Sequence, residues 1–345
     1  MTIHELLGIE LPVIQAPMAG VQDAELAATI SNAGGLGSLP CAMLSIELLE
    51  AELHRLTSLT DGPFNLNFFC HDTPSVTAEQ HNRWRERLSA YFRELGVDPQ
   101  IVPSGKPREP FGTEALELLE TFRPKVISFH FGLPDKPLLQ RVKSWGSKVL
   151  SSATTVEEAV WLEEHGADAI IAQGLEAGGH RGCFLTTDIS TQTGTLALVP
   201  QICDAVSVPV IAAGGISSPQ AVKAAMTLGA AGVQMGTVFL LCPEARTSPL
   251  HRAALTSEAA RHTALTNVFT GRPARSIVNR LVREVGPMTP DATPFPTAAI
   301  PVTALRTAAE STGNSDFSPL WSGQNAADCC EMPAADLLRH LASGT

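Results

Sequence analysis

The feature that most limits the fold is a repeated alternation between short apolar runs and longer amphipathic stretches. Eight apolar runs occupy residues 12–20, 36–40, 64–69, 125–132, 148–154, 167–174, 208–215 and 230–241. Nearly continuous apolar strands are typical of a parallel sheet that is covered on both faces. Eight such units in about 240 residues predict a (β/α)8 TIM barrel. A doubly wound sheet is the main alternative, but the GxGxxG motif usual near its start is missing.

The segments between the apolar runs predict the helices and the domain organisation. Helical patterns occupy 23–35, 45–59, 135–146, 155–166, 196–206 and 218–229, and 74–122 is helical with an interruption. The stretch at about 97–112 is rich in Pro and Gly and predicts an inserted loop. We therefore expect the barrel at 1–241. Residues 242–345, which end in a helical pattern at 333–342, are expected to form helices and loops that pack on the barrel and cover the substrate site.

Charge and cysteine usage narrow the class of protein. The 345 residues carry a formal net charge of −11, which argues against nucleic-acid binding. The seven cysteines are scattered and include no CxxC pair, so a reduced, cytoplasmic protein is expected. No apolar run reaches the length of about 18 residues that a membrane span needs. Because neither HxH nor HExxH occurs, we expect no metal site.

Two strand ends have the composition of a phosphate site. In a parallel barrel the active site forms at the carboxyl ends of the strands, so the residues after each apolar run should converge. "AAGGIS" (212–217) follows the seventh run, and "QMGT" (234–237) belongs to the eighth. Main-chain N–H groups near Gly215, Gly236 and Thr237, with a helix N-terminus, can hold a phosphate dianion. A plain strand-to-helix turn is the alternative for the Gly-Gly pair alone.

The stretch "GLEAGGHRG" (174–182) places a histidine among glycines at the predicted catalytic face. Its glycines allow the chain to pass close to a flat ring, and His180 would then face the reactive side of that ring. Glu176 either orients His180 or caps the local turn. Arg181 pairs with a phosphate or with a local carboxylate, or it is a solvated surface residue, and the surface interpretation is favoured. His130, in "ISFHFG", is either a satisfied core histidine or a second polar group that faces the substrate.

Six segments in order resemble the nitronate monooxygenase family, formerly called 2-nitropropane dioxygenases. They are "VIQAPMAG", "FNLNFF", "ISFHFG", "AQGLEAGGHRG", "VIAAGGI" and "VQMGT", and the likeness runs over about residues 10–280. "EAGGH" alone is less specific, since flavin-dependent enoyl-ACP reductases carry similar signals. The "SFHFG" strand and the tail "PLWSGQNA" (319–326) favour the class I members.

The resemblance implies an FMN-containing TIM barrel that uses O2 to convert an alkyl nitronate, typically propionate 3-nitronate, to a carbonyl product, nitrite and nitrate. His180 matches the catalytic or substrate-binding histidine, and His130 resembles a substrate-pocket residue. The expected partners are therefore a small nitronate and O2, and a homodimer is compatible with the resemblance. The positions assigned to the cofactor are Ala16, Pro17, Met18, Asn67, Gln173, Gly178, Gly179, Gly214, Gly215, Gln234, Met235, Gly236 and Thr237.

One departure from the family bears on the substrate. Class I relatives often place tyrosines in the C-terminal part of the substrate pocket, whereas the single tyrosine of this chain, Tyr91, lies far upstream. Phe295, within 292–310, stands where a tyrosine is expected, which predicts a more apolar pocket.

Two other functions remain open from the residues alone. An FMN-dependent NAD(P)H reductase of enoyl thioesters or quinones would share the barrel and the FMN site. A non-enzymatic protein that binds flavin or a phosphorylated metabolite is the second alternative. The basic segment 269–280 is either a loop near the flavin or a surface-pairing segment, and the surface interpretation is favoured.

Overall fold

A closed barrel of eight parallel strands forms the centre of the molecule. The computed structural model describes residues 2–100 and 109–345. The strand order is β1-β9-β8-β6-β5-β4-β3-β2, and a parallel bridge between Ile14 and Leu36 joins the two ends. Closure confirms the predicted (β/α)8 barrel and excludes an open doubly wound sheet. The strands are β1 (Val13–Gln15), β2 (Gly37–Pro40), β3 (Phe64–Phe69), β4 (Val126–His130), β5 (Lys148–Ala153), β6 (Ala169–Gln173), β8 (Val210–Ala213) and β9 (Gly232–Met235).

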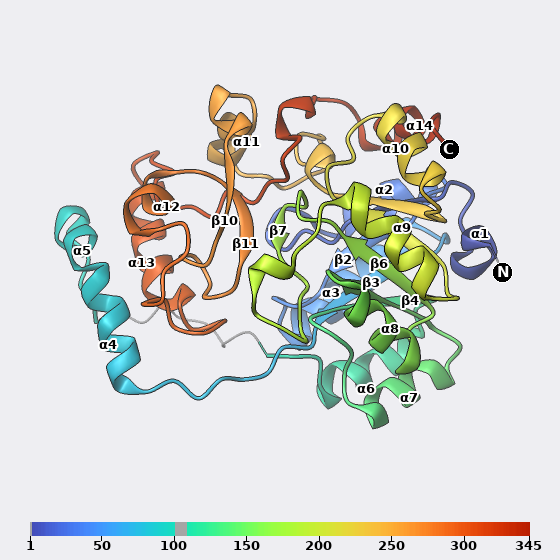
Figure 1. Ribbon diagram of the computed structural model, residues 1–345, viewed down its shortest axis with the longest axis horizontal. Helices are drawn as coiled ribbons and strands as arrows, with labels where there is room; N and C mark the ends of the chain where they lie inside the picture. The colour runs from blue at the N-terminus through green and yellow to red at the C-terminus, as the bar shows by residue number, and fades with distance from the viewer. Residues whose placement is uncertain (1, 101–108) are drawn as a thin grey trace.

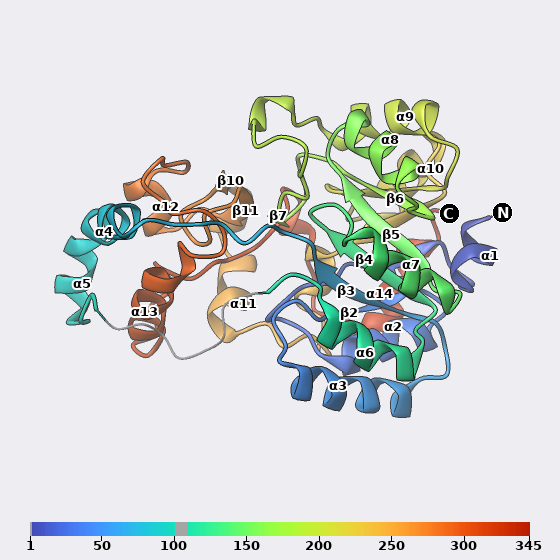
Figure 2. The same cartoon turned by 90° about the horizontal axis from the view of Figure 1, so that it is seen from below.

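Helices surround this barrel, as Figures 1 and 2 show. They begin where side chains cap them: Asp23 accepts a hydrogen bond from the Glu25 amide, and Ser218 accepts one from the Ala221 amide. Within the described part of the chain, no helix is long and apolar enough to cross a membrane. The helices of the ring are α2 (Ala24–Asn32), α3 (Ile46–Leu59), α6 (Thr113–Phe122), α7 (Lys136–Ser144), α8 (Val156–Glu164), α9 (Thr195–Ala205), α10 (Pro219–Thr227) and α14 (Ala334–Ala342).

The eighth strand is shorter than the apolar pattern predicts. The prediction of a strand over 230–241 is wrong beyond Met235, because the backbone leaves the extended conformation at Gly236 (φ −119°, ψ −67°). The chain then enters a 3-10 turn, η2 (Thr237–Phe239). This early exit places Gly236 and Thr237 at the open end of the barrel instead of inside the sheet.

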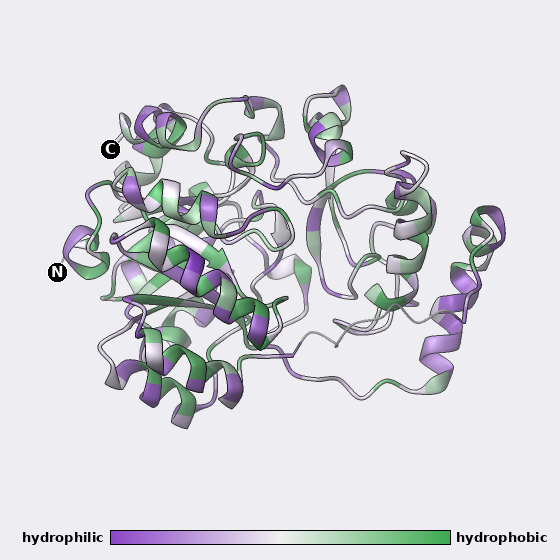
Figure 3. Cartoon of the chain, turned by 180° about the vertical axis from the view of Figure 1, so that it is seen from behind, coloured by the Kyte–Doolittle hydropathy of each residue, from purple (hydrophilic) through white to green (hydrophobic). Residues whose placement is uncertain are grey.

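A second lobe, here called the cap, lies at the carboxyl ends of the strands, and the N-terminal helix α1 (Ile3–Leu7) lies at the opposite end (Figures 1 and 2). Trp84, Phe92, Phe269, Leu281 and Phe317 share the buried core of the cap. Near the outer edge of the cap, α4 is mostly hydrophilic (Figure 3). The cap consists of α4 (Ala78–Arg87), α5 (Ser89–Leu95), β10 (Thr263–Thr266), β11 (Ala274–Ile277), α12 (Arg280–Val285) and α13 (Ala299–Glu310), and α11 (Pro249–Leu255) leads into it.

The packing of two segments does not follow a boundary at residue 241. α4 and α5 come from the chain between β3 and α6 but pack in the cap core, whereas α14 comes last but packs in the barrel core. We therefore propose a discontinuous cap, inserted into the barrel at two places. Residues 101–108 of the expected loop at 97–112 lie outside the described residues, and Phe111 is buried again against the barrel.

A small antiparallel sheet joins the two lobes. β7 (Gly179–His180) belongs to the loop after β6, and it pairs with β11, which also pairs with β10. Ala274 of the cap lies opposite His180 in this register. These strands were not predicted, since their pairing partners lie far apart in the sequence.

The C-terminal helix gives a test of this architecture. Leu338 is fully buried with Leu337 and Leu341 in the core that α14 shares with α2 and α10. We expect Leu338→Ala to lower the free energy of unfolding by about 3 kcal/mol, because the lost side chain leaves a cavity. Urea unfolding followed by circular dichroism measures this. Arg339→Ala on the exposed face of α14 is the control, and equal effects of the two changes would contradict the packing described.

Candidate active site

A cavity that is partly open to solvent lies where the strands of the barrel end. Every residue that the sequence assigns to cofactor or substrate lines this one cavity, including His130 and His180. The set comes from the ends of β1, β3, β4, β6, β8 and β9 and from β7. The barrel geometry therefore brings together positions spread over more than 200 residues of sequence. The roles of the individual residues remain predictions.

One end of the cavity has the features of a phosphate cradle. Gly214 and Gly215 have φ values of 118° and 70°, a region in which glycine is strongly favoured. Within the described part of the chain, the main-chain N–H groups of Gly215 and Ile216 have no hydrogen-bond acceptor. They lie shortly before the N-terminus of α10, whose dipole favours an anion. These features fit a phosphate group.

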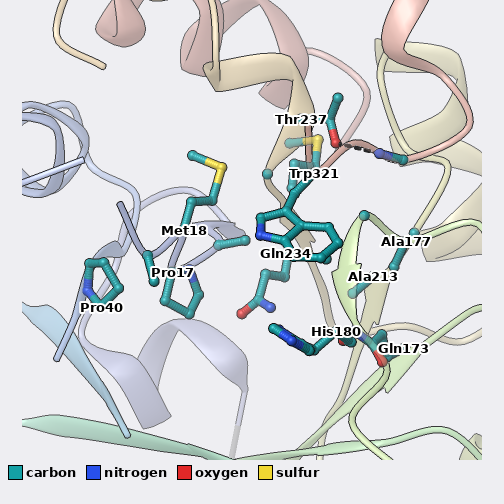
Figure 4. A pocket seen from close by; sticks show the side chains of 18 of the residues that line it. Pro17, Met18, Pro40, Gln173, Ala177, His180, Ala213, Gln234, Thr237 and Trp321 are labelled. Carbon is teal, nitrogen blue, oxygen red and sulfur yellow. Dashed lines mark hydrogen bonds between the residues drawn. The ribbon is translucent and has the colours of Figure 1, made fainter. Parts of the chain in front are cut away.

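The tail segment 319–326 closes over this end. The Gly323 amide donates to Thr237 Oγ1 at 2.9 Å, as the dashed line in Figure 4 shows. Asn325 Nδ2 donates to the Gly215 carbonyl at 2.6 Å. The tail segment 319–326 therefore contacts both predicted phosphate loops, 212–217 and 234–237.

Neutral amides lie deeper in the cavity. Asn67 Nδ2 donates to Ser128 Oγ at 2.9 Å. The Oε1 atom of Gln234 is buried and has no hydrogen-bond partner among residues 2–100 and 109–345. Figure 4 shows the Gln234 amide and the His180 ring directed toward the same space. A buried acceptor without a protein donor fits a bound heterocycle that has a ring N–H, such as a flavin.

His180 stands against an aromatic wall. Its Nε2 hydrogen-bonds to Thr270 Oγ1 at 2.9 Å. The wall comes from four separate segments, with ring centroids 5.3 to 6.3 Å from the imidazole: Phe69, Phe131, Phe295 and Trp321. This arrangement holds the ring in one orientation and gives its surroundings an apolar character.

Hydrogen bonds hold the main chain of His180 as well as its ring. Its carbonyl accepts hydrogen bonds from Gln173 Nε2 at 2.9 Å and from His130 Nε2 at 3.1 Å. His130 Nδ1 in turn accepts from Ser152 Oγ at 3.1 Å. Burial lowers the pKa of His130 to about 3, so its ring is neutral at pH 7. With both ring nitrogens engaged, His130 has the contacts of a satisfied histidine that positions His180.

The low pKa of His130 makes stability depend on pH. In the unfolded chain its pKa returns toward 6.5, so between pH 6.5 and 3 the unfolded state binds a proton that the folded state rejects. We expect the free energy of unfolding to fall as the pH drops below 6.5, by roughly 1 kcal/mol per pH unit from this residue. Urea unfolding at pH 7.5 and 5.5 measures the loss. The loss should shrink in His130→Gln, and an unchanged loss would refute the assignment.

Arg181 and Glu176, which lie close to His180 in the sequence, both have structural contacts. The prediction of a solvated Arg181 is wrong: the side chain is fully buried, and it donates to the carbonyls of Gln173 and Gly174 at 2.6 and 2.7 Å. Burial lowers the pKa of its guanidinium to about 10. Glu176 accepts from the amide and hydroxyl of Thr195 at the start of α9, so it caps a helix instead of orienting His180.

The basic segment 269–280 is not a solvated surface, contrary to the favoured interpretation. It supplies Thr270 to His180, and Arg275 is buried and donates to the Leu175 carbonyl at 2.8 Å. Arg280, at its end, pairs with Glu94 and Glu284. The segment forms β11, which ties the cap to the loop that carries His180.

Several residues of the site are not singled out by the sequence patterns, although Thr270 lies in the segment 269–280 and Trp321 in the tail 319–326. Thr270 and Trp321 reach His180 from the C-terminal part of the chain, and no local pattern indicates such contacts. Phe69 ends a predicted strand at the catalytic face, so its position could have identified it. His251 also lines the cavity, and burial lowers its pKa to about 4.

The chain is similar to proteins of known family over nearly its whole length. A family model described as nitronate monooxygenase matches residues 1–344. The chain belongs to this family. The nitronate monooxygenase of Pseudomonas aeruginosa is 42% identical over 341 residues, which cover 97% of this chain and 96% of that protein. That of Paraburkholderia phytofirmans is 39% identical over 338 residues, with coverages of 97% and 92%.

Solved structures agree with this family membership. A nitroalkane oxidase from Streptomyces ansochromogenes superposes with a TM-score of 0.89 and 38% identity, over 99% of this chain and 96% of its own. FabK from Thermotoga maritima gives a TM-score of 0.71 at 24% identity, which shows a shared fold alone. Nitronate monooxygenases and nitroalkane oxidases are flavoenzymes in general, in agreement with the chemistry of the cavity.

Proposed function

We propose that this protein is an FMN-dependent nitronate monooxygenase that oxidises alkyl nitronates with O2 and releases a carbonyl product with nitrite and nitrate. The observation that carries the proposal is the placement of His180. Its ring is held by Thr270 and its carbonyl by Gln173 and His130, beside a cavity that ends in a phosphate cradle. Family membership supports the same activity.

The cofactor would be held by three groups of residues. The main-chain N–H groups of Gly215, Ile216 and Thr237 would bind the phosphate. The amides of Asn67, Gln173 and Gln234 would meet the polar edge of the ring, and Ala16, Pro17 and Met18 would pack beside it. When bound, the flavin supplies the redox chemistry, while the protein supplies orientation and electrostatics.

The chain's own contribution centres on His180. In its protonated form the imidazolium would hold the nitronate oxygens by a charge-assisted hydrogen bond. In its neutral form it would take the α-proton of a nitroalkane and generate the nitronate in place. Thr270 keeps the ring oriented in either case, and the aromatic wall excludes water from the bound substrate.

Oxygen consumption decides between this function and its alternatives. We expect the purified protein to be yellow and to consume O2 with propyl-1-nitronate or propionate 3-nitronate. NADH added without oxygen should leave the flavin absorbance unchanged. Rapid bleaching by NADH or NADPH would favour the reductase instead. A colourless protein that takes up no flavin on reconstitution would contradict both enzyme functions.

A further inference from the structure

The cavity beside His180 is poor in charge. Among the described residues that line it, none is Lys, Arg, Asp or Glu. Three histidines are among these described lining residues, and burial lowers the pKa values of His130 and His251 to about 3 and 4, so both are neutral at pH 7. His180 is thus the side chain of this set that can meet one negative charge on a substrate.

Three arginines lie close to the site without lining the cavity. Arg272 lies with its guanidinium 3.9 Å from the centroid of the Phe131 ring and donates to the Cys183 carbonyl, and its buried Nε has no hydrogen-bond partner among the described residues. Arg181 donates to Gln192 and to two main-chain carbonyls. Arg275 donates to the Leu175 carbonyl and to Thr263 Oγ1. None of the three lines the cavity.

The segment of the cap that faces His180 is apolar as well. Phe69 and Trp321 line the cavity, and their ring centroids lie 6.3 and 5.3 Å from that of His180. Phe295 is buried against the His180 ring, at a centroid distance of 5.3 Å, and does not itself line the cavity. The stretch 292–302, "ATPFPTAAIPV", contains no charged residue. A substrate group that extends from the nitronate toward this wall meets aromatic carbon, where an unpaired carboxylate is costly to desolvate.

We infer that this protein selects nitronates whose tail is uncharged and apolar, and that it discriminates against a nitronate with a second negative charge. The inference rests on the proposed function, because it names the substrate class of the same site. The nitronate charge is matched by His180, and a carboxylate on the tail finds no cation along the described cavity lining.

Two substrates of equal size test the inference. Propionate 3-nitronate carries a carboxylate where 3-methylbutyl-1-nitronate carries an isopropyl group. We expect kcat/KM, measured as oxygen consumption by the FMN-loaded protein, to be at least about 10-fold higher for the isopropyl compound, equivalent to about 1.4 kcal/mol. A ratio near or below one, with both compounds consumed, would overturn the selectivity. If neither is consumed, the proposed function itself fails.

A pair of substitutions at Phe69, which lines the cavity, locates the discrimination. Phe69→Tyr adds a hydroxyl donor to the wall at nearly constant volume, and we expect it to lower the ratio several-fold. Phe69→Leu keeps the wall apolar, and the ratio should stay high although the absolute rate changes. Flavin content and circular dichroism verify that both variants are folded and loaded. Equal ratios in the two variants would contradict the assignment of the selectivity to this wall.

Discussion

His180→Asn is expected to lower kcat/KM for alkyl nitronates by about 100-fold or more while FMN stays bound. Asparagine can replace one hydrogen bond of the imidazole but can neither carry a positive charge nor accept a proton near neutral pH. The FMN contacts that we propose come from other residues, so the flavin spectrum should persist. Steady-state oxygen consumption and the flavin absorbance of the same preparation measure both effects.

The control for this experiment is His262→Asn, a histidine on the exposed surface of the cap side. It should retain wild-type turnover. Thr270→Val removes the hydrogen bond to His180 Nε2, whereas Thr270→Ser keeps a hydroxyl there. We expect a loss of turnover in the valine variant and recovery in the serine variant. Near wild-type turnover in His180→Asn would rule out His180 as the key group.

Gly178→Ala is expected to raise the Kd for FMN by about 10-fold or more, since overpacking of this kind costs roughly 1–3 kcal/mol. A Cβ at residue 178 would lie 2.6 Å from both the Gly323 nitrogen and the Ser322 carbonyl carbon. Both contacts are main-chain atoms, which cannot rotate away. The tail would have to move, and the hydrogen bond from Gly323 to Thr237 would be lost with the closed phosphate end.

Flavin fluorescence during titration of the apoprotein measures this Kd. Gly112→Ala is the matched control, because a Cβ there would meet only the Pro110 carbonyl oxygen at 3.8 Å. Gly178 does not have a positive φ, so backbone strain in the alanine variant does not contribute to the change in Kd. An unchanged Kd in Gly178→Ala would show that the tail is not needed to hold the cofactor.

Much of the barrel was predictable because its signals are local. Apolar runs mark the strands, and cap residues such as Asp23 and Ser218 mark the helix starts. Strand ends in a parallel barrel meet at one face, so His180, Gly215 and Gln234 could be assigned to a common site from their positions after the runs. The family motifs then suggested which chemistry this site performs.

The sequence could not predict contacts that join distant segments. Arg181 has a side chain typical of surfaces, yet it is buried, because two carbonyls at the end of β6 and Gln192 accept its hydrogen bonds. α4 has a hydrophilic pattern, but Trp84 inserts into a core that includes Val268 and Phe317, more than 180 positions later. No local periodicity records such partners.

By itself, then, the sequence determined the barrel, the catalytic face and the residues that gather there, since these follow from periodicity and from the direction of parallel strands. Only the tertiary structure decided how His180 is held. β7 pairs with β11, Thr270 reaches the imidazole and Phe295 closes the wall, and each contact joins segments about 90 or more residues apart. Long-range pairing depends on the packing of both lobes together, and local sequence patterns do not encode it.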